Sequence, residues 1–325
     1  MTVSLSRWML VLFLGLWGLS EGPIAHAQPA LPPDAPQALQ QFDTDYSQST
    51  IDLSTLRSGG PPKDGIPSID DPSFVSVDAA QDWIAPKEPI IVIEQNGVAK
   101  GYPLQILTHH EIVNDEIGGT PVAVTFCPLC YSSIAFRQCA ENVPDAHVLS
   151  RETGYSRPYG QNPYAGYDNV DESPFLYDGP TDDRLPPKEK VITVSLDDTH
   201  KAYPHSVTKQ KRVVHDTVGD RSLVVFHAPG AVSALDARRI ADSKEDGSTG
   251  VFDRRVDGQT LTFTYAGDGR FKDKNTGSTW TVAGRAVEGP LKGTQLERIA
   301  HGNYFSFAWF AFRPETAIYS PSPNS

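Results

Sequence analysis

Short hydrophobic runs, rather than long amphipathic periods, dominate the pattern of this 325-residue chain. Ile90–Ile93, Val122–Phe126 and Leu261–Tyr265 are four or five residues long and rich in β-branched or aromatic side chains. Turn-forming residues separate such runs, as at Asn96-Gly97 and Asp257-Gly258. Runs of this length between turn signals are typical of strands joined by hairpins.

Helices are expected in only a few short places. Ser76–Trp83 is the first, and Tyr102-Pro103 opens a second, because proline is favoured where a helix begins. The aromatic run Phe305–Phe312 predicts a helix whose rings face the core. The sequence therefore predicts a mainly β protein of the α+β class, with two duplicated β-rich modules and short peripheral helices.

An internal repeat is the basis for expecting two modules. Residues 90–118 align without gaps on residues 191–219, with seven identical positions and five exchanges of isoleucine for valine. The identities include Tyr102-Pro103 with Tyr203-Pro204, Asp115 with Asp216, and Gly118 with Gly219. Identities in the same order over a whole unit indicate duplication. Each copy is expected to form a hairpin, a short helix and a second hairpin.

The expected organisation has five parts. They are a signal peptide (1–27), a flexible tether (28–50), a first β-rich module (51–137), a connector (138–187) and a second β-rich module (188–320). The signal has Arg7 before an apolar core and Ala25-His26-Ala27 as a cleavage signature. Cleavage after Ala27 predicts a periplasmic or extracellular protein, and an uncleaved membrane anchor is the alternative.

The connector is rich in proline, glycine and tyrosine, notably in the run Asn162-Pro163-Tyr164-Ala165-Gly166-Tyr167-Asp168. This composition indicates an extended segment with stacked tyrosines. Such a segment either packs across both modules or forms a lid or wall of a pocket.

The formal net charge of −12 at pH 7 narrows the possible partners. An acidic surface disfavours binding to nucleic acid and to anionic lipid head groups. No stretch after the signal is long and apolar enough to cross a membrane. The sequence does not identify a small-molecule substrate or a redox partner.

The candidate chemistry lies at Cys127 and Cys130, two of the three cysteines. Two thiols at this spacing can hold one metal ion or close into a disulfide. His110 stands one predicted strand before them, and thiolate with imidazole suits copper, zinc or iron. We expect a transition-metal site at these three residues, for metal handling or metal-dependent redox chemistry. The alternative for His109 and His110 is that they are ordinary polar residues at a helix end.

The second copy offers a further ligand. Continued with one deletion, the alignment matches Val124-Thr125-Phe126 to Val224-Val225-Phe226 and places His227 at the position of Cys127. If the copies face each other about a pseudo-twofold axis, His227, or His215 at the position of Asn114, completes the metal site.

Two other functions remain open for the same cysteines. The pair can cycle between dithiol and disulfide, which would make the protein a thiol–disulfide oxidoreductase. Alternatively, Cys127 or Cys130 pairs with Cys139 as a structural disulfide in a non-catalytic binding module, which an oxidising compartment permits. Whether the protein is an enzyme is left open.

Several motifs, in order, resemble a known family. They are His110-Glu111-Ile112-Val113-Asn114-Asp115, Gly118-Gly119-Thr120-Pro121-Val122, Phe126-Cys127-Pro128-Leu129-Cys130, Phe252-Asp253-Arg254, Asp257-Gly258, Thr276-Gly277-Ser278-Thr279-Trp280 and Gly289-Pro290-Leu291-Lys292-Gly293. Over roughly residues 64–314 the chain resembles domain-of-unknown-function family 3179 (DUF3179). It is similar to the longer, duplicated form, because the second copy intervenes between the thiol pair and the later motifs. The resemblance implies an exported bacterial protein and no particular activity.

Overall fold

The computed structural model describes residues 37–42, 46, 49, 52–56, 58–133 and 146–321. The expected signal peptide, much of the tether and Cys139 lie outside these residues. The chain divides into two compact units, Met1–Ser58 and Gly59–Ser325. The described part of the first unit holds two short 3-10 helices, η1 (Gln37–Gln41) and η3 (Leu53–Thr55). Both copies of the repeat lie in the second unit.

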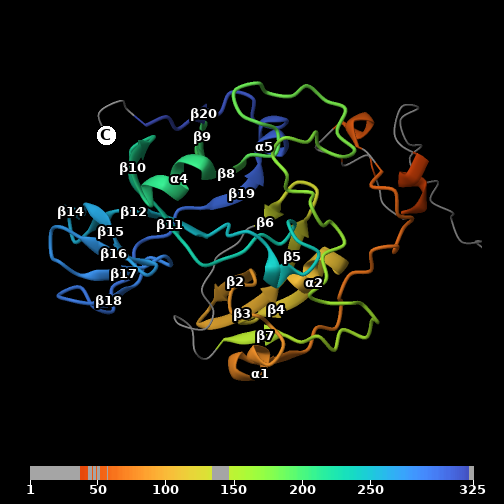
Figure 1. Ribbon diagram of the computed structural model, residues 1–325, viewed down its shortest axis with the longest axis horizontal. Coiled ribbons are helices and arrows are strands. Elements are labelled where there is room, and N and C mark those ends of the chain that lie inside the picture. Colours follow the sequence, from red (N-terminus) through yellow and green to blue (C-terminus); the bar gives the residue numbers. More distant parts are fainter. Residues whose placement is uncertain are drawn as a thin grey trace, which may run out of the picture. The chain divides into compact units, whose positions relative to one another are not determined.

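The second unit is mainly β, as predicted, with a few short helices (Figure 1). Its first part contains β1 (Phe74–Ser76), α1 (Val77–Gln81), β2 (Ile90–Gln95), β3 (Val98–Pro103), α2 (Leu104–His110), β4 (Ile112–Ile117), β5 (Thr120–Cys127), β6 (Ser132–Ser133) and β7 (His147–Leu149). Its second part contains β8 (Lys190–Leu196), β9 (Thr199–Pro204), α4 (His205–Lys211), β10 (Val213–Val218), β11 (Arg221–Ala228), η4 (Ile240–Asp242), β12 (Ser248–Asp253), β13 (Arg255–Val256), β14 (Gln259–Thr260), β15 (Phe263–Gly267), β16 (Arg270–Asp273), β17 (Thr279–Thr281), β18 (Ala286–Glu288), β19 (His301–Phe305), α5 (Ser306–Phe310) and β20 (Ala317–Ile318).

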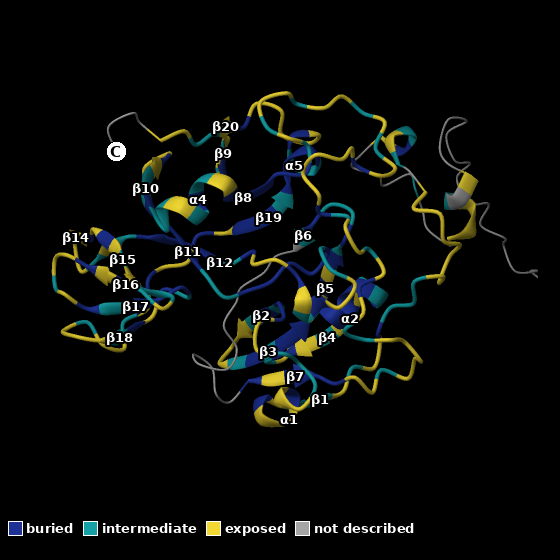
Figure 2. Cartoon of the chain, viewed as in Figure 1, coloured by how far each residue is buried: buried dark blue, intermediate teal, exposed yellow. Residues whose placement is uncertain are grey.

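The largest sheet joins the two copies of the repeat. Its seven strands lie in the order β20-β9-β8-β19-β6-β5-β4, so it contains the first hairpin of the second copy and the second hairpin of the first. Among the described residues, four smaller sheets have the orders β1-β7-β3-β2, β10-β11-β12, β13-β14 and β15-β16-β17-β18. Buried residues run through β8, β11, β12 and β19 (Figure 2). The two expected modules therefore share one sheet within one compact unit.

Both copies have the same order of elements, β2–β3–α2–β4–β5 and β8–β9–α4–β10–β11. In each copy the helix follows a proline, Pro103 or Pro204. Each helix ends at a residue with positive φ, Glu111 at 59° and Arg212 at 62°. A left-handed residue after the last turn is a common way to end a helix, and here it directs the chain into the next strand.

The register of the second hairpin shows how the repeat continues. Ile112 pairs with Thr125 in β4–β5, and Val213 pairs with Phe226 in β10–β11. Both partners in the second hairpin are shifted from those in the first by 101 residues, the same offset as between the two aligned segments. The predicted deletion is therefore wrong, because the two hairpins have turns of equal length.

This register moves His227 away from the position of Cys127. At the constant offset of 101 residues, His227 corresponds to Phe126. The Phe126 amide donates to the carbonyl of Glu111 at 2.9 Å, and the His227 amide donates to the carbonyl of Arg212 at the same distance. Ala228 is then the residue at the position of Cys127. Successive strand residues point to opposite faces, so a shift of one residue places the imidazole on the other side of the sheet.

The identical residues of the repeat make the same contacts in both copies. The carboxylate of Asp115 accepts hydrogen bonds from Lys100 Nζ at 2.8 Å and from Tyr102 Oη at 2.6 Å. In the second copy Asp216 accepts from Lys201 Nζ at 2.8 Å and from Tyr203 Oη at 3.0 Å. Both tyrosines are fully buried. The lysine, aspartate and tyrosine of this Lys–Asp–Tyr set are identical in the two copies because each set holds one hairpin against its neighbour. A structural role therefore explains these identities without a catalytic one.

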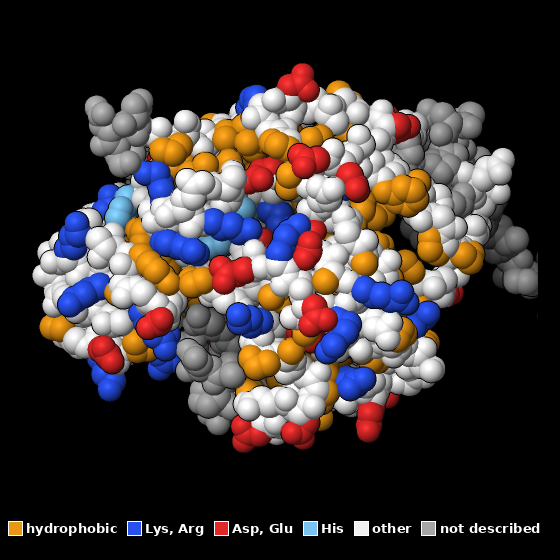
Figure 3. Space-filling model, viewed as in Figure 1, with side chains coloured by type: hydrophobic (Ala, Val, Ile, Leu, Met, Phe, Trp, Pro, Cys, Tyr) orange, Lys and Arg blue, Asp and Glu red, His pale blue; other side chains and the backbone are white. Residues whose placement is uncertain are grey.

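The helices differ in how far they are covered. Six of the seven residues of α2 are buried, whereas α4 buries two, so α2 departs from the expected peripheral placement. Connector tyrosines pack against the hydrophobic cluster to which α2 belongs, which explains the difference. None of the described helices has the length and hydropathy needed to cross a bilayer. On the face drawn in Figure 3, acidic and basic side chains are interspersed rather than separated by sign.

We expect Asp115→Asn to lower the free energy of unfolding by about 1–3 kcal/mol, because Lys100 and Tyr102 lose a charged acceptor. Urea denaturation measures the difference. Glu288→Gln makes the same change at an exposed position of β18 and should stay within about 0.5 kcal/mol of wild type. Equal losses in the two variants would contradict a structural role for the Lys–Asp–Tyr set.

We expect His227 to make the protein less stable in acid. Burial lowers the pKa of this imidazole to about 3, so between an ordinary pKa of about 6.5 and that value only the unfolded chain binds the proton. The free energy of unfolding then falls as pH falls, by up to about 1.4 kcal/mol per pH unit from this group. His227→Phe, which installs the residue found in the first copy, should flatten the slope between pH 6 and 4 in urea titrations. Exposed His147→Phe is the control, and an unchanged slope in His227→Phe would refute the assignment.

Candidate functional site

The two cysteines lie on a tight turn between two strands. Cys127 ends β5, and Cys127-Pro128-Leu129-Cys130 leads into β6, which pairs antiparallel with β5. The amide of Cys130 donates to the carbonyl of Cys127 at 3.3 Å. Tyr131 follows with φ of 49°, a left-handed conformation that turns the chain back. The thiols therefore belong to a strand–turn–strand and not to the start of a helix.

The sulfurs of Cys127 and Cys130 lie 2.7 Å apart, and both residues are half-buried. A disulfide bond measures about 2.05 Å. Two thiolates on one tetrahedral zinc ion lie about 3.8 Å apart, since each metal–sulfur bond is about 2.3 Å. The observed distance lies between these two values and is nearer to the disulfide, so closing a disulfide needs only a small movement.

The two thiols differ in acidity. The close contact with the Cys130 thiol lowers the pKa of Cys127, with further help from the amides of Cys130 and Leu129, and outweighs the effect of burial. The pKa of Cys130 is raised, first by the same contact with Cys127 and then by burial. Cys127 is therefore the sulfur that ionises first, and thiolate is the nucleophilic form.

A carboxylate stands beside the pair. Glu111, the residue that ends α2, is half-buried, and burial raises its pKa. Its negative charge acts on both sulfurs and raises the pKa of each. Tyr164 Oη donates to Glu111 Oε1 at 3.1 Å. The carboxylate is thus held in place and lies within electrostatic range of both thiols.

The connector supplies the other wall. Tyr167 Oη donates to the carbonyl of Leu129 at 3.1 Å, and burial raises its pKa to about 12, so it remains a donor. With Tyr164 on Glu111, two tyrosines of the expected connector contact the site. Sequence reasoning did not assign Glu111, Tyr164 or Tyr167 to it, although all three lie in motifs already singled out.

His110 is engaged elsewhere. Its Nδ1 lies 2.8 Å from the carbonyl oxygen of Pro67, and its Nε2 lies 2.7 Å from Tyr159 Oη. His109 Nε2 lies 3.0 Å from the carbonyl oxygen of Gln161. Burial lowers the pKa of both imidazoles. The two rings tie α2 to the connector and to the chain before β1.

The histidines of the second copy are likewise bonded to other groups. His227 Nδ1 lies 2.9 Å from Thr208 Oγ1, and its Nε2 lies 3.0 Å from the carbonyl oxygen of Asp246. His215 Nε2 accepts from the amide of Phe263 at 2.9 Å. Within the described ranges, no group of three or more His, Cys, Asp or Glu side chains is arranged to hold a metal ion. Only the two sulfurs of the predicted metal site come together, and metal binding stays a prediction.

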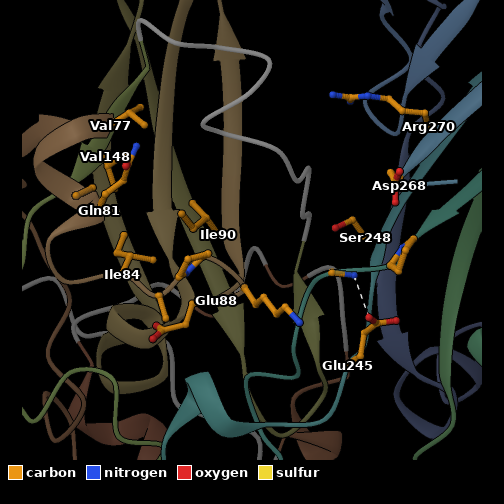
Figure 4. Close-up of a pocket in the computed structure, with 17 residues that line it drawn as sticks. Val77, Gln81, Ile84, Glu88, Ile90, Val148, Glu245, Ser248, Asp268 and Arg270 are labelled. Atoms are coloured by element: carbon orange, nitrogen blue, oxygen red, sulfur yellow. Dashed lines mark hydrogen bonds between the residues drawn. The ribbon is translucent and has the colours of Figure 1, made fainter.

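A cavity of about 760 Å³ has no cysteine among the described residues that line it. Val77, Ile84 and Ile90 line one side, and Glu245 and Asp268 line the other (Figure 4). Its volume is that of a small-molecule pocket, but the described part of its lining contains neither of the two thiols. The candidate chemistry is therefore assigned to the thiol turn.

Comparison with known proteins adds a family and no relative of known activity. Residues 63–142 and 134–316 match the family model described as "Protein of unknown function (DUF3179)". No curated protein and no solved structure gave a match. The double match agrees with the two hairpin–helix–hairpin copies, and the thiol turn lies in the first matched stretch. The chain belongs to the DUF3179 family, in a duplicated form.

Proposed function

We propose that the protein is a thiol–disulfide oxidoreductase, with Cys127 as the attacking thiol and Cys130 as the resolving thiol. The observation that carries the proposal is the 2.7 Å sulfur separation, together with the lowered pKa of Cys127 and the raised pKa of Cys130. Two thiols whose pKa values are shifted in opposite directions suit a two-step exchange. The more acidic sulfur attacks first, while the other keeps its proton until the second step.

The exchange proceeds through a mixed disulfide. The Cys127 thiolate attacks one sulfur of a substrate disulfide, and the other substrate sulfur leaves as a thiolate that takes a proton from water. Cys130 then loses its proton and attacks Cys127, which releases the second substrate thiol and closes the 127–130 disulfide. Two electrons and two protons pass to the substrate, and the reverse sequence oxidises a dithiol.

Glu111 is the base for the second step. A half-buried carboxylate with a raised pKa accepts a proton more readily than an ordinary surface carboxylate. Its charge also disfavours a thiolate on either sulfur, so Cys130 stays protonated until the mixed disulfide has formed. The hydrogen bond from Tyr164 keeps the carboxylate beside the turn.

The expected export of the chain agrees with this chemistry, because disulfide substrates are found in oxidising compartments. Metal handling rests on ligand type alone, since the imidazoles of His110, His215 and His227 are bonded elsewhere. A structural bond to Cys139 rests on the cysteine count. One set of measurements separates the three.

We expect the mature protein to form a reversible 127–130 disulfide in glutathione redox buffers, read by mass spectrometry after alkylation. Cys130→Ser should trap a mixed disulfide at Cys127, Cys127→Ser should abolish exchange, and Cys139→Ser should behave as wild type. Stoichiometric metal that is lost in Cys130→Ser would support the metal site instead. A disulfide between Cys139 and either site cysteine that glutathione does not reduce would refute the redox proposal.

We expect Glu111→Gln to lower the pH midpoint for alkylation of Cys127, because the negative charge that raises the pKa of this thiol is removed. At pH 7 the rate with iodoacetamide should rise about two- to fivefold. Resolution of the mixed disulfide should slow in the same variant, since the base is lost. Glu116→Gln changes an exposed glutamate on β4 and is the matched control; equal midpoints in both variants would exclude an electrostatic role for Glu111.

A further inference from the structure

The residue after the thiol pair is held by the second copy. Tyr131 Oη donates to Asp246 Oδ2 at 2.8 Å, across 115 residues of sequence. Lys190 Nζ lies 3.8 Å from the centre of the Tyr131 ring, a cation–π contact. Tyr131 is 7% exposed, so both contacts are made away from water. Its left-handed backbone is unusual for an aromatic residue and agrees with a side chain anchored from outside.

Asp246 is itself fixed on several sides. Lys190 Nζ contacts Oδ2 at 2.8 Å, while Lys209 Nζ and His205 Nδ1 contact Oδ1 at 3.2 and 3.3 Å. The Asp246 amide donates to the carbonyl of Ala231 at 2.6 Å. Contacts with Lys190, His205 and Lys209 hold the pKa of Asp246 well below its usual range despite its burial. Tyr131 is therefore bonded to an immobile carboxylate.

Two more contacts from outside the first copy reach the same half of the turn. The amide of Phe305, at the end of β19, donates to the carbonyl of Cys130 at 2.9 Å. Tyr167 Oη donates to the carbonyl of Leu129 at 3.1 Å. Cys127 is held by the β5 ladder, so the position of Cys130 relative to it depends on these contacts and on Tyr131.

We propose that Tyr131, assisted by Tyr167, is a positioning residue that sets the dithiol–disulfide equilibrium of Cys127 and Cys130. The inference rests on the proposed function. Closing a disulfide depends on the effective concentration of one thiol at the other, which rises when the segment between them is held in the bonding geometry. The second copy then acts as the support for the chemistry of the first.

The test is the equilibrium constant for disulfide formation against glutathione in Tyr131→Phe, which keeps the ring and removes the bond to Asp246. We expect the constant to fall about three- to tenfold, which corresponds to a potential about 15–30 mV less negative. Tyr203→Phe removes a similar buried tyrosine–aspartate bond that does not contact the turn, and should leave the constant unchanged. Unfolding curves confirm that both variants are folded.

The outcomes separate the two proposals. A reversible 127–130 disulfide with the wild-type constant in Tyr131→Phe overturns the positioning role and leaves the redox function standing. Absence of a reversible disulfide in the wild type overturns the redox function. If Tyr131→Phe does not fold, Tyr167→Phe carries the test, because it frees the Leu129 carbonyl at a half-buried position. An unchanged constant there also rejects the proposal.

Discussion

A buried carboxylate, Asp246, is the point on which the junction of the two copies depends. Burying a charge is costly unless cations and hydrogen-bond donors surround it. Here they come from β8 through Lys190, from α4 through His205 and Lys209, and from the thiol turn through Tyr131. Lys190 also contacts Asp168 of the connector at 3.4 Å. Satisfying one charge thus brings together both copies and the segment between them.

The two copies share their structural contacts and differ at the candidate site. Each copy keeps the Lys–Asp–Tyr set, whose contacts hold its hairpins together. At the positions that carry the candidate chemistry the copies differ: Glu111 corresponds to Arg212, and Cys127 corresponds to Ala228. The first copy therefore holds the thiols, while the second supplies charged groups that support them. This division accounts for two similar copies that differ at the candidate site in the described part of the chain.

The thiol turn shows how a strand–turn–strand can tune cysteines. Many reactive cysteines owe a lowered pKa to the start of a helix or to a nearby cation. In this protein the contact with the partner thiol and the turn amides stabilise the Cys127 thiolate. Glu111 opposes that effect through its charge, and the balance between them sets how much thiolate is present.

The sequence alone determined the local features. Hairpin turns at Asn96-Gly97 and Asp257-Gly258, helices that follow a proline, and two thiols brought together by their spacing all depend on neighbours a few residues apart. The mainly β class and the family follow from many such features together.

Only the tertiary structure decided which side chains meet across the chain. An unbroken apolar run such as Leu223–Phe226 does not alternate and so leaves the strand register open by one residue; that step moved His227 from the position of Cys127 to that of Phe126. His110 contacts the carbonyl oxygen of Pro67 and the hydroxyl of Tyr159. No sequence motif marks either residue as its partner. Glu111 is singled out by its place beside the thiols, and Asp246 by its burial among basic side chains. Burial and long-range pairing depend on how whole sheets pack, and no short stretch of sequence contains that information.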